Sequence, residues 1–444
     1  MSAPQVEQYV NHVNILTNQE KFHELGEIIS KSIEPLAKNL QHLDASLESL
    51  ELPKHSLGIL AVLVAKFNLA IQNIASNPDA CKALFIQFKE FINKCAINQV
   101  RCAPELFAEL CHVFTQSLVE LKIPIQGIDI LCQAIKKYQT SNNQLTSIHS
   151  DLYKLCLLAK CLKPSLEFIN VDVTSISNEC GQQDSKYFLL YYYYGGMIYT
   201  ALKNYDRALY FFEVCITVPA MAVSHIMLEA YKKYILISLM IHGKINDIPK
   251  YASPVLVRFI KPLSQPYQEL SVAYQTHSCE DVQGVINKYQ DIFIRDNNRG
   301  LVGQVYSYLY KKNIQRLTKT FLTLSVTDVG SRVQLSGPAE AEKYVLNMIQ
   351  DGEIFATINH KDGMVVFHDD PEKYNSPRML ARLEKEMAIC AELDKKVLEQ
   401  EEQVMQMPQF IRKTCGQLDQ DDNSSNLSSN NVSHIMSKHN PYSM

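Results

Sequence analysis

The chain has 444 residues, of which 46% are hydrophobic, and its formal net charge is −4. This length allows more than one hydrophobic core, and the small negative charge argues against a strongly basic surface for nucleic acid or membranes. The 15 glycines are few for this length, which fits a helical protein because glycine weakens helix interiors.

The chain begins with MSAPQVEQYV, where no basic segment precedes an apolar one, so we expect no secretory signal. Its longest apolar run, LGILAVLVA at 57–65, is too short to cross a bilayer and predicts a buried helix face. The twelve cysteines have irregular spacing and form no CxxC pair, as expected of reduced, mostly buried thiols. These features favour a protein of the cytoplasm and nucleus.

Helical periodicity dominates from about residue 5 to 300. The stretch FLLYYYYGGMIYT at 188–200 favours a strand by propensity alone, but its wider window fits a tetratricopeptide template. The template's glycine falls on Gly196, and its aromatic, alanine and phenylalanine positions fall on Tyr192, Tyr199, Ala208 and Phe212. Gly195 departs from the template, which has leucine there. The small residues would allow the two helices of a hairpin to pack closely.

A register of lysines repeats around this window. ELKIP, CLKPS, ALKNY and HGKIN place Lys122, Lys163, Lys203 and Lys244 at intervals of 41, 40 and 41 residues. Each lies between two apolar helical stretches, so we interpret them as exposed turn residues between the paired helices of successive repeats. Such repeats bury their apolar faces only by stacking, which predicts a right-handed helical-repeat solenoid similar to tetratricopeptide repeats.

The stretch from about 309 to 370 has the element order of a winged helix, with three short helices before a β-hairpin. KKNIQRLTKTFLTLSV predicts a first helix whose apolar face comprises Ile314, Leu317, Phe321 and Leu324. A second helix would contain Val329, Val333 and Leu335. The third would begin at Pro338, a favourable first-turn residue, and end at Gly352.

The segment DGEIFATINHKDGMVVFHDDP at 351–371 predicts the hairpin, because two short runs flank the turn residues Asp362 and Gly363. We expect Ile354, Ala356 and Ile358 to face the core of the module. The candidates for exposed, partner-binding side chains are Phe355, Val365 and Phe367. A strand at a sheet edge offers unpaired backbone groups to which a neighbouring subunit can add its own strand.

A long amphipathic helix is predicted from about 376 to 405. Its apolar stripe comprises Leu380, Leu383, Met387, Cys390, Leu393 and Val397. The stripe can pack against its own chain or against helices of partner subunits, and all its members except Cys390 are partner-interface candidates. From 416 onward the chain turns to serine, asparagine and aspartate, which predicts a disordered tail, and we assign residues 411–444 to it.

Helical repeats that lead into a winged helix resemble the PCI family. The stretches that carry the resemblance include YYYYGGMIYTALKNYDRALYFFE (191–213) and VQLSGPAEAEKYVLNMIQDGEIFATINHKDGMVVFHD (333–369), with others at 42–67, 143–161, 220–239 and 309–325. The resemblance implies N-terminal repeats over 1–196 and a PCI domain over 197–370. Within that domain, repeats would extend to about 305 and the winged helix would occupy about 309–370; the C-terminal helix would follow over 371–410.

PCI proteins are structural subunits of the proteasome lid, the COP9 signalosome and a translation initiation factor, and these stretches are most similar to signalosome members. The resemblance therefore implies a non-catalytic scaffold in the complex that removes a ubiquitin-like modifier from the cullins of ubiquitin ligases. Its partners would be other signalosome subunits, bound through the winged helix and the C-terminal helix, and cullin-RING ligases through the assembled complex. A scaffold subunit of the lid or the initiation factor is the alternative.

Catalytic and metal-binding signatures are missing from the sequence. There is no HExxH, GxSxG or phosphate loop. The nearest candidate metal cluster is His360, His368, Asp369 and Asp370. The two histidines would lie about four strand residues apart, roughly 13 Å, which is too far for one zinc ion. We therefore expect no enzyme activity, no metal and no cofactor.

A winged helix can also bind DNA through its third helix, so nucleic-acid binding is a second alternative. Residues 338–353 carry Glu340, Glu342, Asp351 and Glu353 against Lys343, a charge balance that would repel phosphate. A basic cluster does occur on the first helix, at Lys311, Lys312, Arg316 and Lys319. We interpret it as a solvated face or a contact with an acidic partner.

Overall fold

The computed structural model describes residues 4–37, 50–72, 78–176, 185–246, 248–249, 251–369 and 376–421. Its described residues form two compact units. The first comprises the chain up to Thr320 together with Thr327–Tyr344, and the second comprises Phe321–Val326 and the chain from Val345 onward.

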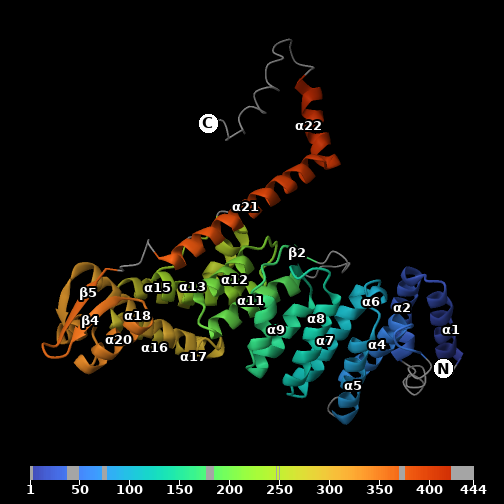
Figure 1. Ribbon diagram of the computed structural model, residues 1–444, viewed down its shortest axis with the longest axis horizontal. Coiled ribbons are helices and arrows are strands. Elements are labelled where there is room, and N and C mark those ends of the chain that lie inside the picture. Colours follow the sequence, from blue (N-terminus) through green and yellow to red (C-terminus); the bar gives the residue numbers. More distant parts are fainter. Residues whose placement is uncertain are drawn as a thin grey trace. The chain divides into compact units, whose positions relative to one another are not determined.

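The first part of unit 1 is a series of helices that lie side by side in chain order (Figure 1). They are α1 (Pro4–Asn18), α2 (Phe22–Ala37), α4 (Ser56–Gln72), α5 (Pro78–Lys94), α6 (Ile97–Val100), α7 (Pro104–Glu120), α8 (Ile125–Tyr138), α9 (Ile148–Ala159), α10 (Lys163–Ile169), α11 (Ser185–Ala201), α12 (Tyr205–Thr217) and α13 (His225–His242). Two short strands, β1 (Gln144–Leu145) and β2 (Ser175–Ile176), pair in parallel.

The unit continues through shorter helices. They are η1 (Leu256–Ile260), α14 (Lys261–Leu263), α15 (Gln265–Gln275), α16 (Cys279–Lys288), α17 (Gln290–Arg295), the longer α18 (Arg299–Thr320) and α19 (Val326–Val333). One cluster of buried apolar side chains extends from Tyr9 in α1 to Leu309 in α18. This continuous core confirms the predicted helical-repeat solenoid.

The tetratricopeptide template fits α11 and α12. Ala208 and Phe212 are fully buried, and Gly196 lies so close to Phe212 that an added Cβ would come within 2.8 Å of its ring. Gly195, which departs from the template, makes the same approach to Phe211, with a Cβ-to-ring distance of 2.6 Å. A leucine at Gly195 would therefore collide with Phe211, so the two glycines allow α11 and α12 to pack closely.

The lysine register marks helix ends. Lys122 and Lys203 have left-handed backbone conformations, with φ of 59° and 60°. In each case the next N–H donates to a carbonyl five residues back, Ile123 to Leu118 and Asn204 to Tyr199, which is the bond that closes a Schellman motif. Lys163 is different, since it begins α10; the left-handed residue of that turn is Lys160.

The elements that follow give the winged-helix order, α18, β3 (Thr323–Ser325), α19, α20 (Pro338–Gln350), β4 (Phe355–Asn359) and β5 (Met364–His368). The third helix and its end are confirmed, since Gly352 has φ of 70° and the next N–H donates to Met348 O. The first helix was predicted too long. It ends at Thr320, and Leu324 belongs to β3, because LTLSV at 322–326 alternates apolar and polar residues as a half-buried strand does.

Two helices follow the hairpin, α21 (Pro377–Met405) and α22 (Pro408–Asp421). The first confirms the predicted C-terminal helix. The second overturns the predicted disorder for residues 411–421, where Pro408 occupies the first helical position and a run of helix-compatible residues follows. The remaining part of that prediction, residues 422–444, lies outside the described residues.

Candidate protein-interaction surfaces

The small sheet of unit 2 has the strand order β3–β5–β4, with both pairings antiparallel. The central strand is therefore β5, and the described sheet has edges at β3 and β4. Sequence reasoning found the hairpin and its turn, in which Gly363 has φ of 61°, but missed β3. The alternation in LTLSV at 322–326 was the signal for that strand.

The hairpin register decides which side chains are exposed. Ala356 pairs with Phe367 and Ile358 pairs with Val365, so these four side chains share the inner face. Val365 is fully buried and Phe367 is 6% exposed. Both were predicted to be exposed, and that prediction is wrong.

The error has a simple cause. The turn at 360–363 has four residues, so even-numbered positions of β4 lie opposite odd-numbered positions of β5. The sequence prediction instead placed the odd-numbered side chains of both strands on the exposed face. It was right for β4, where Phe355 is 41% exposed while Ala356 and Ile358 are partly covered.

Backbone hydrogen bonds identify the groups at the outer edge of β4. Phe367 N–H donates to Leu322 O at 2.8 Å, so odd-numbered residues of β5 direct their backbone groups toward β3. Because these groups alternate along a strand, Val366 bonds to its partner Thr357 in β4. The N–H and C=O groups of Ala356 and Ile358 then point to the outer edge. Among the described residues no strand pairs there.

Phe355 projects from the other face of the same strand. It lies opposite His368, whose ring is bonded to the Thr357 hydroxyl at 3.0 Å. The outer face of the hairpin therefore combines an exposed aromatic ring with polar groups that can accept or donate hydrogen bonds. An aromatic ring beside polar groups is typical of the anchor residues of protein interfaces.

Helix α21 carries the second candidate surface. Its N-terminus is capped by Ser376, whose side chain accepts a hydrogen bond from Met379 N–H. The five predicted interface side chains are between 45% and 71% exposed; they are Leu380, Leu383, Met387, Leu393 and Val397. Ile389, Leu398, Val404 and Met405 extend the exposed apolar surface. An exposed apolar stripe of this length is typical of a helix that packs against other helices.

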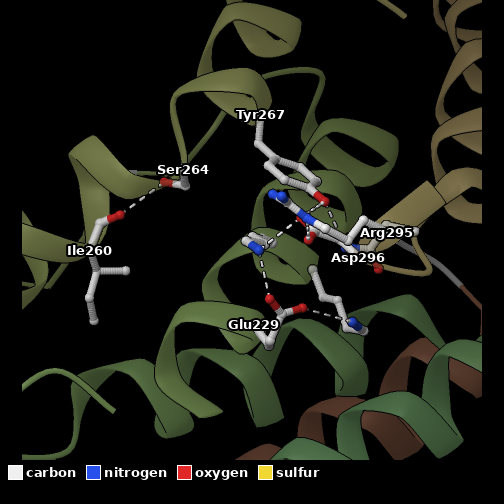
Figure 2. A network of polar contacts seen from close by, with 9 residues as sticks. Glu229, Ile260, Ser264, Tyr267, Arg295 and Asp296 are labelled. Atoms are coloured by element: carbon white, nitrogen blue, oxygen red, sulfur yellow. Dashed lines mark hydrogen bonds and ion pairs between the residues drawn. The ribbon is translucent and has the colours of Figure 1, made fainter. Parts of the chain in front are cut away.

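Unit 1 contains a buried polar network (Figure 2). Lys232 Nζ lies 2.6 Å from Glu229 Oε1 and 2.8 Å from Asp296 Oδ2. Tyr267 donates its hydroxyl to the same Asp296 oxygen at 2.9 Å, and Asn298 donates to Tyr267 at 2.8 Å. The network joins α13 to α15 and to the turn between α17 and α18.

This network is structural in character. Each charged group has an opposite charge as its partner, as a buried ion requires. Lys233 of the same helix is 3.9 Å from Glu229, and burial lowers its pKa despite that carboxylate. The arrangement fixes the packing of three segments and was not foreseen from the sequence, because Lys232 and Asp296 are 64 residues apart.

A second buried pair joins α7 to α9, where His112 Nδ1 is hydrogen-bonded to the Asp151 carboxylate. Burial raises the pKa of Asp151, although His112 opposes this. The His112 ring stacks on Tyr187 of α11, with ring centroids 4.1 Å apart. A catalytic pair would need a nucleophile bonded to the same ring. In the described structure His112 has no hydroxyl or thiol partner.

Other chemistry is not apparent in the described part of the chain. No group of three or more potential ligands could hold a metal ion among those residues. Asp370, the last member of the candidate cluster, lies outside them. Ten described cysteines are free thiols, and burial raises the pKa of most, Cys156 and Cys215 to about 12. None of the described helices is both long and apolar enough to span a membrane.

Comparison with known proteins gives the family. A family model described as the N-terminal helical repeats of COP9 signalosome complex subunit 3 matches residues 19–256, and the PCI domain model matches 286–369. The COP9 signalosome complex subunit 3 of Drosophila melanogaster is 46% identical over 431 residues, 94% of this chain and 96% of that protein. The chain belongs to the COP9 signalosome subunit 3 family.

A second relative with this name, from Dictyostelium discoideum, is 36% identical over 395 residues, which cover 87% of this chain and 92% of the relative. Membership of the subunit 3 family confirms the resemblance to PCI proteins. The matched PCI domain contains all three strands of the β3–β5–β4 sheet, and therefore the edge of β4 and Phe355.

Proposed function

We propose that this chain is a non-catalytic scaffold subunit of the COP9 signalosome and binds other signalosome subunits through two surfaces. One is the outer edge of β4 with Phe355, and the other is the apolar stripe of α21. The observation that carries the proposal is that both surfaces are exposed in unit 2, where no described strand pairs with the outer edge of β4 and the helix has large apolar side chains. Edge addition and helix packing are standard modes of subunit assembly.

Through the assembled complex, the chain would contribute to removing a ubiquitin-like modifier from cullins and so regulate cullin-RING ligases. The chemistry would belong to another subunit. This part of the proposal rests on the family membership, with cytoplasm and nucleus as the proposed locations.

A nucleic-acid role is disfavoured by the charges of α20 and the residues after it. Glu340, Glu342, Asp351 and Glu353 outnumber Lys343 there, and a DNA-binding helix needs the opposite balance. A scaffold subunit of the proteasome lid or the initiation factor would have the same architecture. The two relatives described above are named as signalosome subunits, which favours the signalosome.

The test is a Phe355→Glu substitution in the tagged full-length chain. Placing a charge on an aromatic anchor should cost about 2 kcal/mol of binding or more, roughly a 30-fold loss in affinity. When the tagged variant is affinity-purified from cell extract, the eluate should contain little of the other signalosome subunits and little cullin-deconjugating activity. Quantitative mass spectrometry and an activity assay measure both.

Leu346→Glu in α20 is the matched control, since Leu346 is 44% exposed and belongs to a helix, not to a strand of the sheet. It should leave recovery unchanged, and both variants should keep the wild-type unfolding temperature. Wild-type recovery by a folded Phe355→Glu chain would refute binding through β4. Recovery of lid or initiation-factor subunits by the wild type would assign the chain to a different complex.

A further inference from the structure

The segment between α13 and α15 has an unusual backbone. Lys261 N–H donates to Leu256 O, five residues back, so residues 256–260 form a π-helix. Pro262 follows directly and has no N–H to offer Arg258 O, while its ring crowds that carbonyl. A wider turn relieves the conflict, and such turns recur at functional sites.

The π-helix separates an inner from an outer face. Leu256 and Ile260 are fully buried, and Ser264 donates its hydroxyl to Ile260 O at 3.1 Å on the inner side (Figure 2). Three apolar side chains are exposed to solvent, Val257 at 58%, Phe259 at 48% and Leu263 at 60%. Arg258, Lys261 and Pro262 are exposed beside them, and these six residues are called the 257–263 face below.

The charges on this face have one sign. Residues 248–268 contain no aspartate or glutamate. Arg258 lies 5.7 Å from the ring centre of Phe259, and neither Arg258 nor Lys261 has an ion-pair partner among the described residues. The next carboxylate, Glu269, is already bonded to Lys288 at 2.9 Å and to Tyr289 at 2.8 Å.

We propose that the 257–263 face binds an acidic segment of another protein that also carries apolar side chains. The apolar side chains would be covered by that segment, and its carboxylates would neutralise Arg258 and Lys261. The face lies between the two family matches, which end at residue 256 and resume at residue 286. It shares no residue with β4 or α21, and the proposal does not depend on the function proposed above.

A membrane surface is the competing partner, since exposed apolar and basic residues also occur in interfacial helices. Those helices bury an apolar face over many turns. The 257–263 face spans seven residues, and Ile260 within it points inward. The short length favours a protein segment, whose carboxylates can approach two cations at fixed positions.

The test uses the full-length chain and a fluorescein-labelled helical peptide, with leucine at every third or fourth position and glutamate elsewhere. Fluorescence anisotropy should show binding that weakens as salt is raised. The double substitution Arg258→Glu/Lys261→Glu should weaken binding of this peptide at least ~10-fold. The same variant should bind a second peptide in which every glutamate is replaced by lysine. This reversal would assign the interaction to the face.

Phe259→Ser/Leu263→Ser is a second variant that keeps both cations, and it should also weaken binding at least ~10-fold. Ile86→Ser, at an exposed apolar position on α5, is the control and should change nothing. Each variant alters exposed side chains, so its unfolding temperature should match the wild type, and the second variant decides the outcome if the first fails to fold.

Absence of peptide binding, or equal loss in the control, would overturn the proposal. Binding to vesicles that contain about 30 mol% phosphatidylserine would also overturn the proposal if the same variants abolished that binding. The face would then recognise a lipid surface.

Discussion

Lys232 is a buried cation held between Glu229 and Asp296, and all three side chains are at most 15% exposed. Removing water from three ions has a large cost, which their mutual attraction and the Tyr267 hydrogen bond offset. The network adds little net stability compared with apolar packing. Removing only the cation is more costly than removing the whole network, because buried carboxylates would remain without an opposite charge.

Lys232→Met should therefore lower the free energy of unfolding by about 3–5 kcal/mol, since it leaves Glu229 and Asp296 without their shared cation. Urea unfolding followed by circular dichroism measures the change.

Lys136→Met is the matched control. Lys136 is also 2.7 Å from a carboxylate, that of Glu167, but both side chains are more than half exposed. An exposed pair of this kind contributes about 1 kcal/mol or less. If the two substitutions had equal effects, the charges of the network would not be buried in solution.

Single side chains also mark where sequence reasoning fails. The burial of Phe367 and the exposure of Phe355 follow from one register, which depends on the number of turn residues. Alternation within each strand was visible in the sequence. The register between strands was not, because both strands contain apolar residues on both faces.

At the scale of elements, one kind of ending recurs among the helices of unit 1. Residues with positive φ close several of them, including Glu20, Lys122, Lys160, Lys203 and Asn297, and in each case the following N–H donates five residues back. Glycine adopts this conformation without strain, whereas a residue with a Cβ loses about 1 kcal/mol. The lysines therefore hold a conformation that glycine would hold more easily.

Lys122→Gly and Lys203→Gly should each raise the free energy of unfolding by about 0.5–1 kcal/mol, because the native φ suits glycine better than lysine. Both side chains are exposed and form no ion pair in the described structure. Thermal unfolding measures the change.

The control is Lys89→Gly, an exposed position inside α5, which should lower stability by about 1 kcal/mol. Opposite signs at the helix ends and in the helix interior would support the assignment. A loss of stability in all three variants would mean that the lysine side chains themselves stabilise the turns.

At other helix ends, lysine side chains from neighbouring elements donate hydrogen bonds to the terminal carbonyl groups. Lys137 Nζ donates to the carbonyls of Ile92 and Asn93 near the end of α5, at 2.6 Å each, and Lys312 donates to Ile241 O of α13 at 2.6 Å. These carbonyls have no partner within their own helix. The basic cluster of α18 thus has a structural role at Lys312, which sequence charge alone did not reveal.

For the whole molecule, the repeat architecture and the winged-helix order could be predicted because apolar periodicity extends over long segments. The short strand β3 and the continuation of helix into α22 were missed, since the sequence signal of each covers only a few residues and is weak. The Lys232 network and the His112–Asp151 pair depend on contacts between distant segments, which no local pattern records.

The apolar stripe of α21 was predicted to pack either on its own chain or on partners, and a truncation separates these alternatives. A chain that ends at Asp369 lacks α21 and α22, whose apolar side chains are exposed. Its unfolding free energy should change by less than about 1 kcal/mol, while its recovery of signalosome subunits should fall sharply. Calorimetry and affinity purification measure the two quantities.

A chain that ends at Met405 lacks α22 but keeps α21. It should still bind most of its partners if the apolar stripe of α21 contacts them. A large loss of stability in the chain that ends at Asp369 would contradict binding of partners through the stripe and would show that α21 packs on its own chain.

The exposed stripe of α21 also affects how many copies of this chain can persist. A copy made in excess of its partners keeps that helix uncovered, and uncovered apolar side chains are what chaperones and proteases recognise. Excess copies would therefore be removed first, and the abundance of the chain would follow the abundance of its partners without a dedicated sensor.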